Sequence, residues 1–223
     1  DMPMFYGNVI PSEWGELGLQ FYGRYKWGDG RGLSYSFYVV NGLEQRVVNP
    51  GDPLTGGPLR DMRNNFLDTH NSHKSVGWQF QLEPSPGLTF GVSGYEGVYT
   101  ETGQYRIYIG DAHMSWKRGK FTLRGEFATT LQETETNTLL KLGGYGLLSY
   151  RFKYVEPIVM VDAIRLDGSR ELDRIAATFG VAVFPFPQKV PSSSVRASYA
   201  PRWNLQTGEI ATHHLSLEAR VAF

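Results

Sequence analysis

The sequence predicts an all-β protein, an antiparallel β-barrel that spans a membrane. About eleven segments alternate apolar and polar side chains over roughly ten residues each, as strands do when their two faces meet different surroundings. Aromatic residues make up 14% of the chain and 26 residues are glycine, which suits strands with aromatic girdles and tight turns. No stretch approaches the roughly 18 to 20 consecutive apolar residues of a spanning helix, which excludes a helical membrane protein.

The first half of the chain contains four clear strands and one unclear strand. In 15–27, Phe21 and Tyr25 share one face while Arg24 and Lys26 share the other. The same two-residue period, with Leu, Phe, Trp and Val opposite Ser, Thr and Gln, predicts strands in 32–41, 75–82 and 88–98.

Segment 104–117 is also expected to be a strand, but its facing stays open. Ile107 and Ile109 fall on the same side as Asp111 and His113, so that side is neither apolar nor polar throughout.

The second half of the chain repeats the alternation more regularly. Helical periodicity appears nowhere with comparable strength. The expected strands are 120–131, 139–152, 154–164, 174–186, 192–203 and 215–223, the last of which ends on the aromatic Phe223.

The connections divide into two sets if Phe223 lies at the periplasmic end. Alternate connections are then brief and rich in Gly or Pro, as periplasmic turns are, while the others are longer. Segment 43–74 is by far the longest, and we interpret it either as an extracellular loop that caps the barrel or as a loop that constricts the pore. Residues 1–223 are expected to form one barrel domain that lacks its N-terminal strands, because single-chain bacterial barrels have even strand numbers. Asp1–Ile10 is a candidate for the end of a twelfth strand.

The polar face of the strands is expected to line the barrel interior. A water-filled interior keeps such side chains charged, and a surplus of one sign favours passage of the opposite ions. The same residues could instead form neutral networks across neighbouring strands, and both readings stay open. The expected pore-lining residues are Arg24, Lys120, Arg124, Glu126, Lys141, Arg151, Asp162, Arg174, Arg196, Glu218 and Arg220, and the charged candidates of a constriction loop are Arg60, Asp61, Arg63 and Asp68.

Composition and motifs argue against several other functions. Twenty-two basic and 22 acidic residues balance, whereas a nucleic-acid-binding domain carries a basic stripe. Cysteine is absent, which excludes thiolate metal sites and disulfides. His70 and His73 lack a helix and a third ligand, so we expect no metal and no cofactor. The His-x-Ser pairs at His113 and His214 would face the interior, so we expect no catalytic residues and no enzyme activity.

Several short sequence segments resemble segments of a known protein family. The segment Gly32–Gly42 (GLSYSFYVVNG) resembles a strand of the phosphate-selective porin O/P family. Further phrases that resemble this family are Ile10–Gly18, Leu59–Arg63, Asn71–Gly77, Pro86–Tyr95 and Leu123–Glu126.

The resemblance implies a barrel of 16 or more antiparallel strands in the outer membrane of a Gram-negative bacterium, of which this chain would be the C-terminal two-thirds. It implies a porin, a passive diffusion channel for small polar solutes or ions, assembled as a homotrimer among outer-membrane lipid and lipopolysaccharide. The basic surplus of the polar face adds a weak anion preference. The alternative is a non-conducting scaffold whose interior is plugged by its own loop or by a partner protein, bound there or at the extracellular loops.

Overall fold

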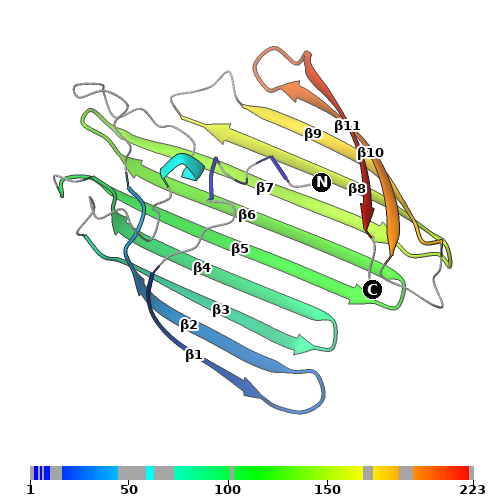
Figure 1. Ribbon diagram of the computed structural model, residues 1–223, viewed down its shortest axis with the longest axis horizontal. Coiled ribbons are helices and arrows are strands. Elements are labelled where there is room, and N and C mark those ends of the chain that lie inside the picture. The colour runs from blue at the N-terminus through cyan, green and yellow to red at the C-terminus, as the bar shows by residue number, and fades with distance from the viewer. Residues whose placement is uncertain are drawn as a thin grey trace.

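The computed structural model describes residues 3, 4, 6, 8–10, 17–44, 59–62, 73–100, 103–167, 173–185 and 193–220. These residues form a single antiparallel sheet in which each strand pairs with its neighbours in sequence (Figure 1). The strands are β1 (Gly18–Lys26), β2 (Gly32–Val40), β3 (Ser75–Ser85), β4 (Leu88–Val98), β5 (Arg106–Arg118), β6 (Phe121–Glu133), β7 (Thr138–Tyr150), β8 (Val155–Leu166), β9 (Arg174–Val183), β10 (Ser194–Asn204) and β11 (Ile210–Arg220), and a short 3-10 helix, η1, spans Leu59–Met62. Within these ranges, no helix is long and apolar enough to cross a membrane.

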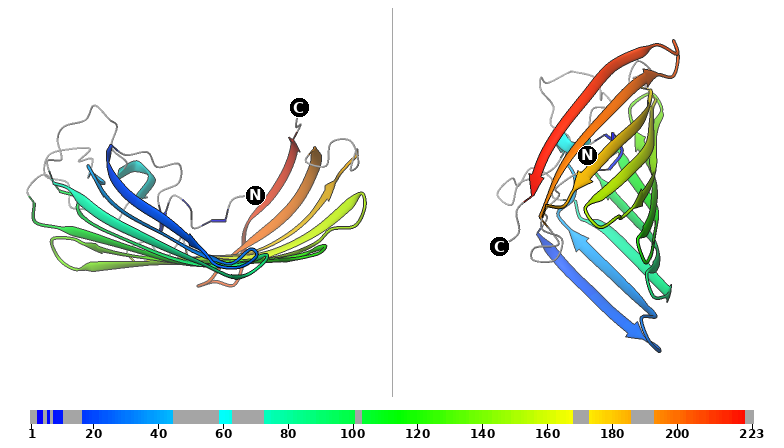
Figure 2. Two further views of the ribbon diagram at one scale, coloured as in Figure 1. Left: turned by 90° about the horizontal axis from the view of Figure 1, so that it is seen from below. Right: turned by 90° about the vertical axis from the view of Figure 1, so that its right-hand side faces the viewer.

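The predicted all-β class, the antiparallel pairing and the strand number are confirmed, but the sheet is not closed into a barrel. It curves into an open trough with β1 and β11 as its two edges (Figure 2). Both edge strands run from the same end of the sheet to the other, because eleven antiparallel strands reverse direction an even number of times. A direct pairing of β1 with β11 would therefore be parallel.

The connections alternate between the two ends of the sheet, as the sequence predicts. Connections from odd to even strands lie at one end, which we call the turn end, and those from even to odd strands lie at the loop end (Figure 1). The turn 119–120 is made tight by Gly119, whose φ of 59° is a left-handed conformation that residues with a Cβ rarely adopt.

Two pieces of chain lie inside the trough, on its concave face (Figure 2). The described residues of 3–10, called here the inner segment, cross the middle strands, and η1 lies over the sheet nearer to the loop end. The inner segment is not the twelfth strand that the sequence suggested. Its one described bridge joins Tyr6 to Ile10 within the segment itself, and it is hydrogen-bonded to the sheet through side chains of the sheet, such as Asp162 and Glu126.

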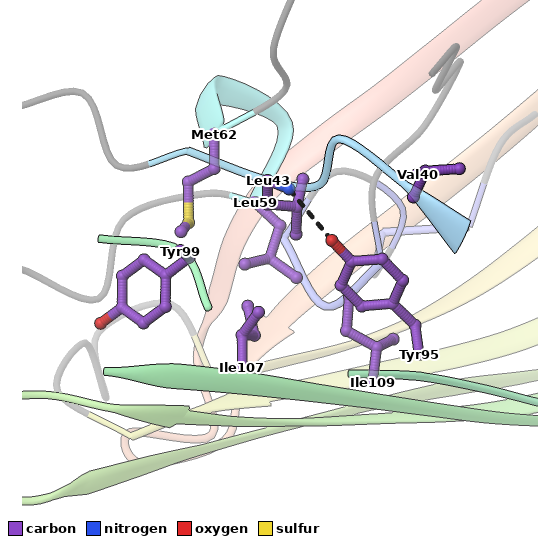
Figure 3. Packing of buried hydrophobic residues seen from close by; sticks show 8 residues of the cluster. All are labelled: Val40, Leu43, Leu59, Met62, Tyr95, Tyr99, Ile107 and Ile109. Carbon is purple, nitrogen blue, oxygen red and sulfur yellow. Dashed lines mark hydrogen bonds between the residues drawn. The ribbon is translucent and has the colours of Figure 1, made fainter. Parts of the chain in front are cut away.

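The register settles the facing of β5. Ile107 and Ile109 point to the concave face together with Asp111 and His113. The two isoleucines are buried at the loop end because η1 and the end of β2 cover them (Figure 3). The two polar residues lie farther along the strand. All four side chains of β5 therefore point to the same face, and the pattern is mixed because other parts of the chain cover only the loop end of that face.

Candidate functional site: the concave face

The concave face is mainly polar on β6, β10 and β11, whereas on β8 apolar side chains such as Ile158 and Met160 lie between Glu156 and Asp162. Arg124 and Glu126 of β6 neighbour Leu147 and Tyr145 of β7, and Asp162 of β8 follows. The remaining charged side chains on this face of β9 to β11 are Arg174, Arg196, Arg202, Glu218 and Arg220.

The convex face is apolar and exposed. Phe127 is 53% exposed and Val161 47%, values normally found for polar surface residues. The exposed large hydrophobic side chains on this face of β2 to β10 are Phe37, Val39, Val76, Trp78, Phe80, Leu82, Phe90, Val92, Tyr108, Phe127, Leu131, Leu148, Tyr150, Val155, Val159, Val161, Phe179, Val181, Val183, Val195 and Tyr199.

Aromatic pairs mark the turn end of the convex face. The ring centroids are 5.8 Å apart in Tyr25–Trp27, 5.5 Å in Trp116–Phe121 and 4.9 Å in Tyr150–Phe152. Each pair lies at or beside an odd-to-even connection, so the pairs recur across the sheet at one height.

The inner segment is anchored to the concave face by polar contacts. The Tyr6 hydroxyl donates to Glu126 Oε2 at 2.6 Å, and the Met4 amide donates to Asp162 Oδ1 at 3.1 Å. The Thr130 hydroxyl donates to the Val9 carbonyl. Burial, and then the nearby Glu126 carboxylate, raise the pKa of Tyr6 well above its usual range, so the phenol stays a neutral donor.

An apolar contact adds to these anchors. Val9 is fully buried against Ala128 of β6 and Ile164 and Leu166 of β8 on the concave face. Because polar and apolar contacts act together, the inner segment is a fixed part of the concave face.

The helix η1 is held by a second cluster (Figure 3). Leu43 and Leu59 are fully buried, and Met62 completes the covering layer over Ile107. The Leu43 amide donates to the Tyr95 hydroxyl at 3.0 Å (Figure 3). This part of the predicted loop 43–74 therefore folds over the concave face.

The constriction candidates of this loop are only partly described. Arg60 and Asp61 belong to η1 by their backbone, and Arg63 and Asp68 lie outside the described residues. None of the four predictions is tested at the level of side chains.

A cavity of about 210 Å³ lies between the inner segment and the wall formed by β6 to β11. Arg124, Arg196 and Glu218 line it, and Pro3 of the inner segment forms part of its boundary. Buried Nε atoms of Arg174, Arg196 and Arg202 have no hydrogen-bond partner within the described part of the chain. These unpaired donors lie beneath the surface of the wall at β9 and β10.

Other predicted pore-lining residues lie in different surroundings. Lys141 points to the concave face but is buried, and its ammonium donates to Gln132 at 2.9 Å, so it does not face open solvent there. Lys120 lies in the β5–β6 turn. Arg151 lies just after β7, with its guanidinium 3.5 Å from Glu156 and 3.0 Å from the centre of the Phe184 ring.

The remaining charged residues bear on whether the polar face is a charged pore lining or a set of neutral ion-pair networks. Arg24 pairs with Glu83 at 2.6 Å, and Arg220 approaches Glu218 at 3.8 Å, so part of the face is neutralised by local pairs. On β6 and β7, Glu126 accepts from Tyr6, and Lys141 donates to the uncharged Gln132.

No local sequence pattern indicates the anchors Met4, Tyr6 and Val9, because their partners lie more than a hundred residues away. No group of three or more potential metal ligands occurs among the described residues. His70 lies outside them, so the pair with His73 stays untested.

Comparison with known proteins shows similarity to a distant relative. No protein-family model matches the chain. An uncharacterized protein of Aquifex aeolicus (strain VF5) is 28% identical over 144 residues, which is 62% of this chain. The match covers 31% of that protein, so the chain spans under a third of the relative's length.

Proposed function

We propose that the sheet is part of the wall of an outer-membrane β-barrel through which small polar solutes or ions diffuse passively. The contrast between its two faces carries this proposal. An exposed apolar surface across nine strands would be a severe aggregation hazard in water, whereas hydrocarbon requires such a surface. The opposite face keeps charged side chains around a cavity, as the wall of an aqueous interior does.

The aromatic pairs support the same orientation. Transmembrane barrels place aromatic residues at both borders of an apolar band about 25 Å tall. The pairs Tyr25–Trp27, Trp116–Phe121 and Tyr150–Phe152 would lie at one of these borders, at the turn end.

The open edges fit a larger barrel. In hydrocarbon, each unpaired backbone group costs several kcal/mol, so β1 and β11 need partners. Since both edges run in the same direction, antiparallel closure requires an odd number of additional strands, and the total then becomes even, as in single-chain bacterial barrels. This is consistent with the barrel of 16 or more strands that the porin resemblance implies, in a homotrimer surrounded by lipid and lipopolysaccharide.

The inner segment and η1 would narrow the channel, and the arginines beside the cavity would favour anions weakly. Ionised groups at a constriction lower the barrier for counter-ions, and the effect weakens as salt shortens the Debye length from about 10 Å at 0.1 M.

Planar-bilayer recordings of the complete protein test this proposal. The variant Arg124→Glu, Arg196→Glu reverses two charges at the cavity and should shift the reversal potential in a salt gradient toward cation preference. Arg118→Glu, at the turn end of the convex face, is the matched control and should leave the reversal potential unchanged. An unchanged potential in the double variant would show that these arginines do not line the ion path.

A plugged scaffold is the second candidate. It is favoured by the burial of Val9, Leu43 and Leu59, which shows that chain already fills part of the trough. Absence of conductance in a correctly inserted protein would support a scaffold, with a partner bound at the loop end or in the interior, over a channel.

A further inference from the structure

A groove with a volume of about 430 Å³ runs along the convex face over β6, β7 and β8. Its floor is formed by Gly144, Gly146 and Ala163, and Phe127 and Leu142 stand beside it. The groove exists because β7 has no side chain at two successive outward positions. The register aligns Gly144 with Ala163 and so keeps the floor low across two strands.

The floor at Gly146 is open. A Cβ placed there would meet no atom within 4 Å, so the groove continues to the backbone at this point. A larger side chain at residue 146 would therefore fill the groove without a clash in the sheet.

Arg165 stands at the loop-end mouth of the groove. It points outward opposite Leu142, is exposed, and has no hydrogen-bond or ion-pair partner within the described part of the chain. Arg106, another outward arginine near the loop end, differs because it pairs with Glu96. Among the described residues, no carboxylate pairs with Arg165, so it adds a positive charge to one end of an apolar groove.

We propose that this groove binds one acyl chain of an anionic lipid whose phosphate pairs with Arg165. The inference rests on the proposed membrane function. The groove matches the apolar tail, and the guanidinium matches the headgroup, because arginine pairs with phosphate through two parallel hydrogen bonds. The charge lies where the strands leave the apolar band, which is the depth of a lipid headgroup. A second copy of the chain fits less well, because its apolar convex face would bury Arg165 without a partner charge.

Native mass spectrometry of the complete protein, extracted from vesicles of equal parts phosphatidylglycerol and phosphatidylcholine with identical acyl chains, tests the site. Wild type should retain phosphatidylglycerol in preference to phosphatidylcholine. Arg165→Gln should reduce that preference by about two- to fivefold, as loss of an exposed ion pair does. Arg118→Gln, at the opposite end of the convex face, should not change it.

Variants that fill the groove test whether it binds the acyl chain of the lipid. Gly146→Leu should abolish retention of the bound lipid, and Ala163→Leu provides a second variant at the floor. Ala197→Leu, on the convex side of β10, should keep the lipid. Equal lipid retention in wild type, Gly146→Leu and Ala163→Leu would overturn the site. So would loss of oligomers in these variants without loss of lipid, since the groove would then be a subunit contact.

Two readouts keep this test separate from the proposed function. A protein that conducts in planar bilayers but retains no lipid would refute only the lipid site. A protein that does not insert into vesicles at all would refute the membrane function and the lipid site with it.

Discussion

An arginine placed on the convex face should destabilise the protein in lipid far more than an arginine placed next to it on the concave face. Val92 and Ser93 are neighbours at the centre of β4 and point to opposite faces. Val92 is 44% exposed between Phe80 and Ala112, whereas Ser93 faces the concave side beside Asp111.

The depth of Val92 sets the magnitude. It lies four residues from Leu88, which pairs with Trp116 at the turn end, and four residues from Glu96 toward the loop end. Four residues correspond to about 13 Å along a strand, or about 10 Å in height at a strand tilt near 40°. Val92 is thus close to the middle of a 25 Å band, where arginine costs about 2–4 kcal/mol.

Urea unfolding of the protein inserted in phosphatidylcholine vesicles measures this difference. Val92→Arg should lower the free energy of unfolding by about 2–4 kcal/mol. Ser93→Arg should lower it by less than about 1 kcal/mol, because the new charge meets water and the Asp111 carboxylate. Equal losses in the two variants would refute the assignment of the convex face to lipid.

Three further predictions concern the inner segment and η1. Tyr6→Phe removes the hydroxyl that donates to Glu126, at a cost of about 1–3 kcal/mol. It should raise single-channel conductance by loosening the inner segment, and unchanged conductance would contradict its role as a constriction. Because the pKa of Tyr6 is raised, the stability that its neutral phenol contributes is fully present below pH of about 10, the ordinary phenol value, and falls as the pH rises further. Folded wild type and Tyr6→Phe should therefore show equal phenolate absorbance just above that pH, and a larger signal in wild type would contradict the buried anchor. Leu59→Ala removes a fully buried side chain of the η1 cluster and should cost about 2–5 kcal/mol in urea unfolding; no measurable loss would show that η1 is not docked.

Strand positions and facings could be predicted from the sequence where each face has one kind of surroundings along its whole length. In β7, Leu142 and Leu148 point to the convex face while Lys141 and Tyr145 point to the concave face, as the alternation predicts. In β5 the alternation could not decide, because Ile107 and Ile109 are covered by residues from the β2–β3 connection. The alternation of residues within one strand does not show that residues far away in the sequence pack over it.

The sequence predicts on which face a side chain of the candidate site lies, but it does not predict how deeply that side chain is buried. Alternation assigns Lys141 to the polar face, but it does not predict that Lys141 is buried and donates to Gln132 of the neighbouring strand. The anchor Tyr6–Glu126 joins residues 120 positions apart, and the segment around Tyr6 has no periodic pattern. Whether the sheet closes into a barrel could not be predicted from the alternation either, because closure depends on which strands pair at the two edges of the sheet.

Spin labels along β7 of the vesicle-inserted protein test the central claim most directly. Leu147 and Leu148 offer a matched pair of identical residues on opposite faces. A label at Leu148 should collide with dissolved oxygen and be shielded from a water-soluble nickel complex, and a label at Leu147 should show the reverse. Labels at Leu140, Leu142 and Gly146 should behave like Leu148. Access of the nickel complex to Leu148 and its outward neighbours, equal to its access to Leu147, would contradict a sheet with one face in lipid and the other in water.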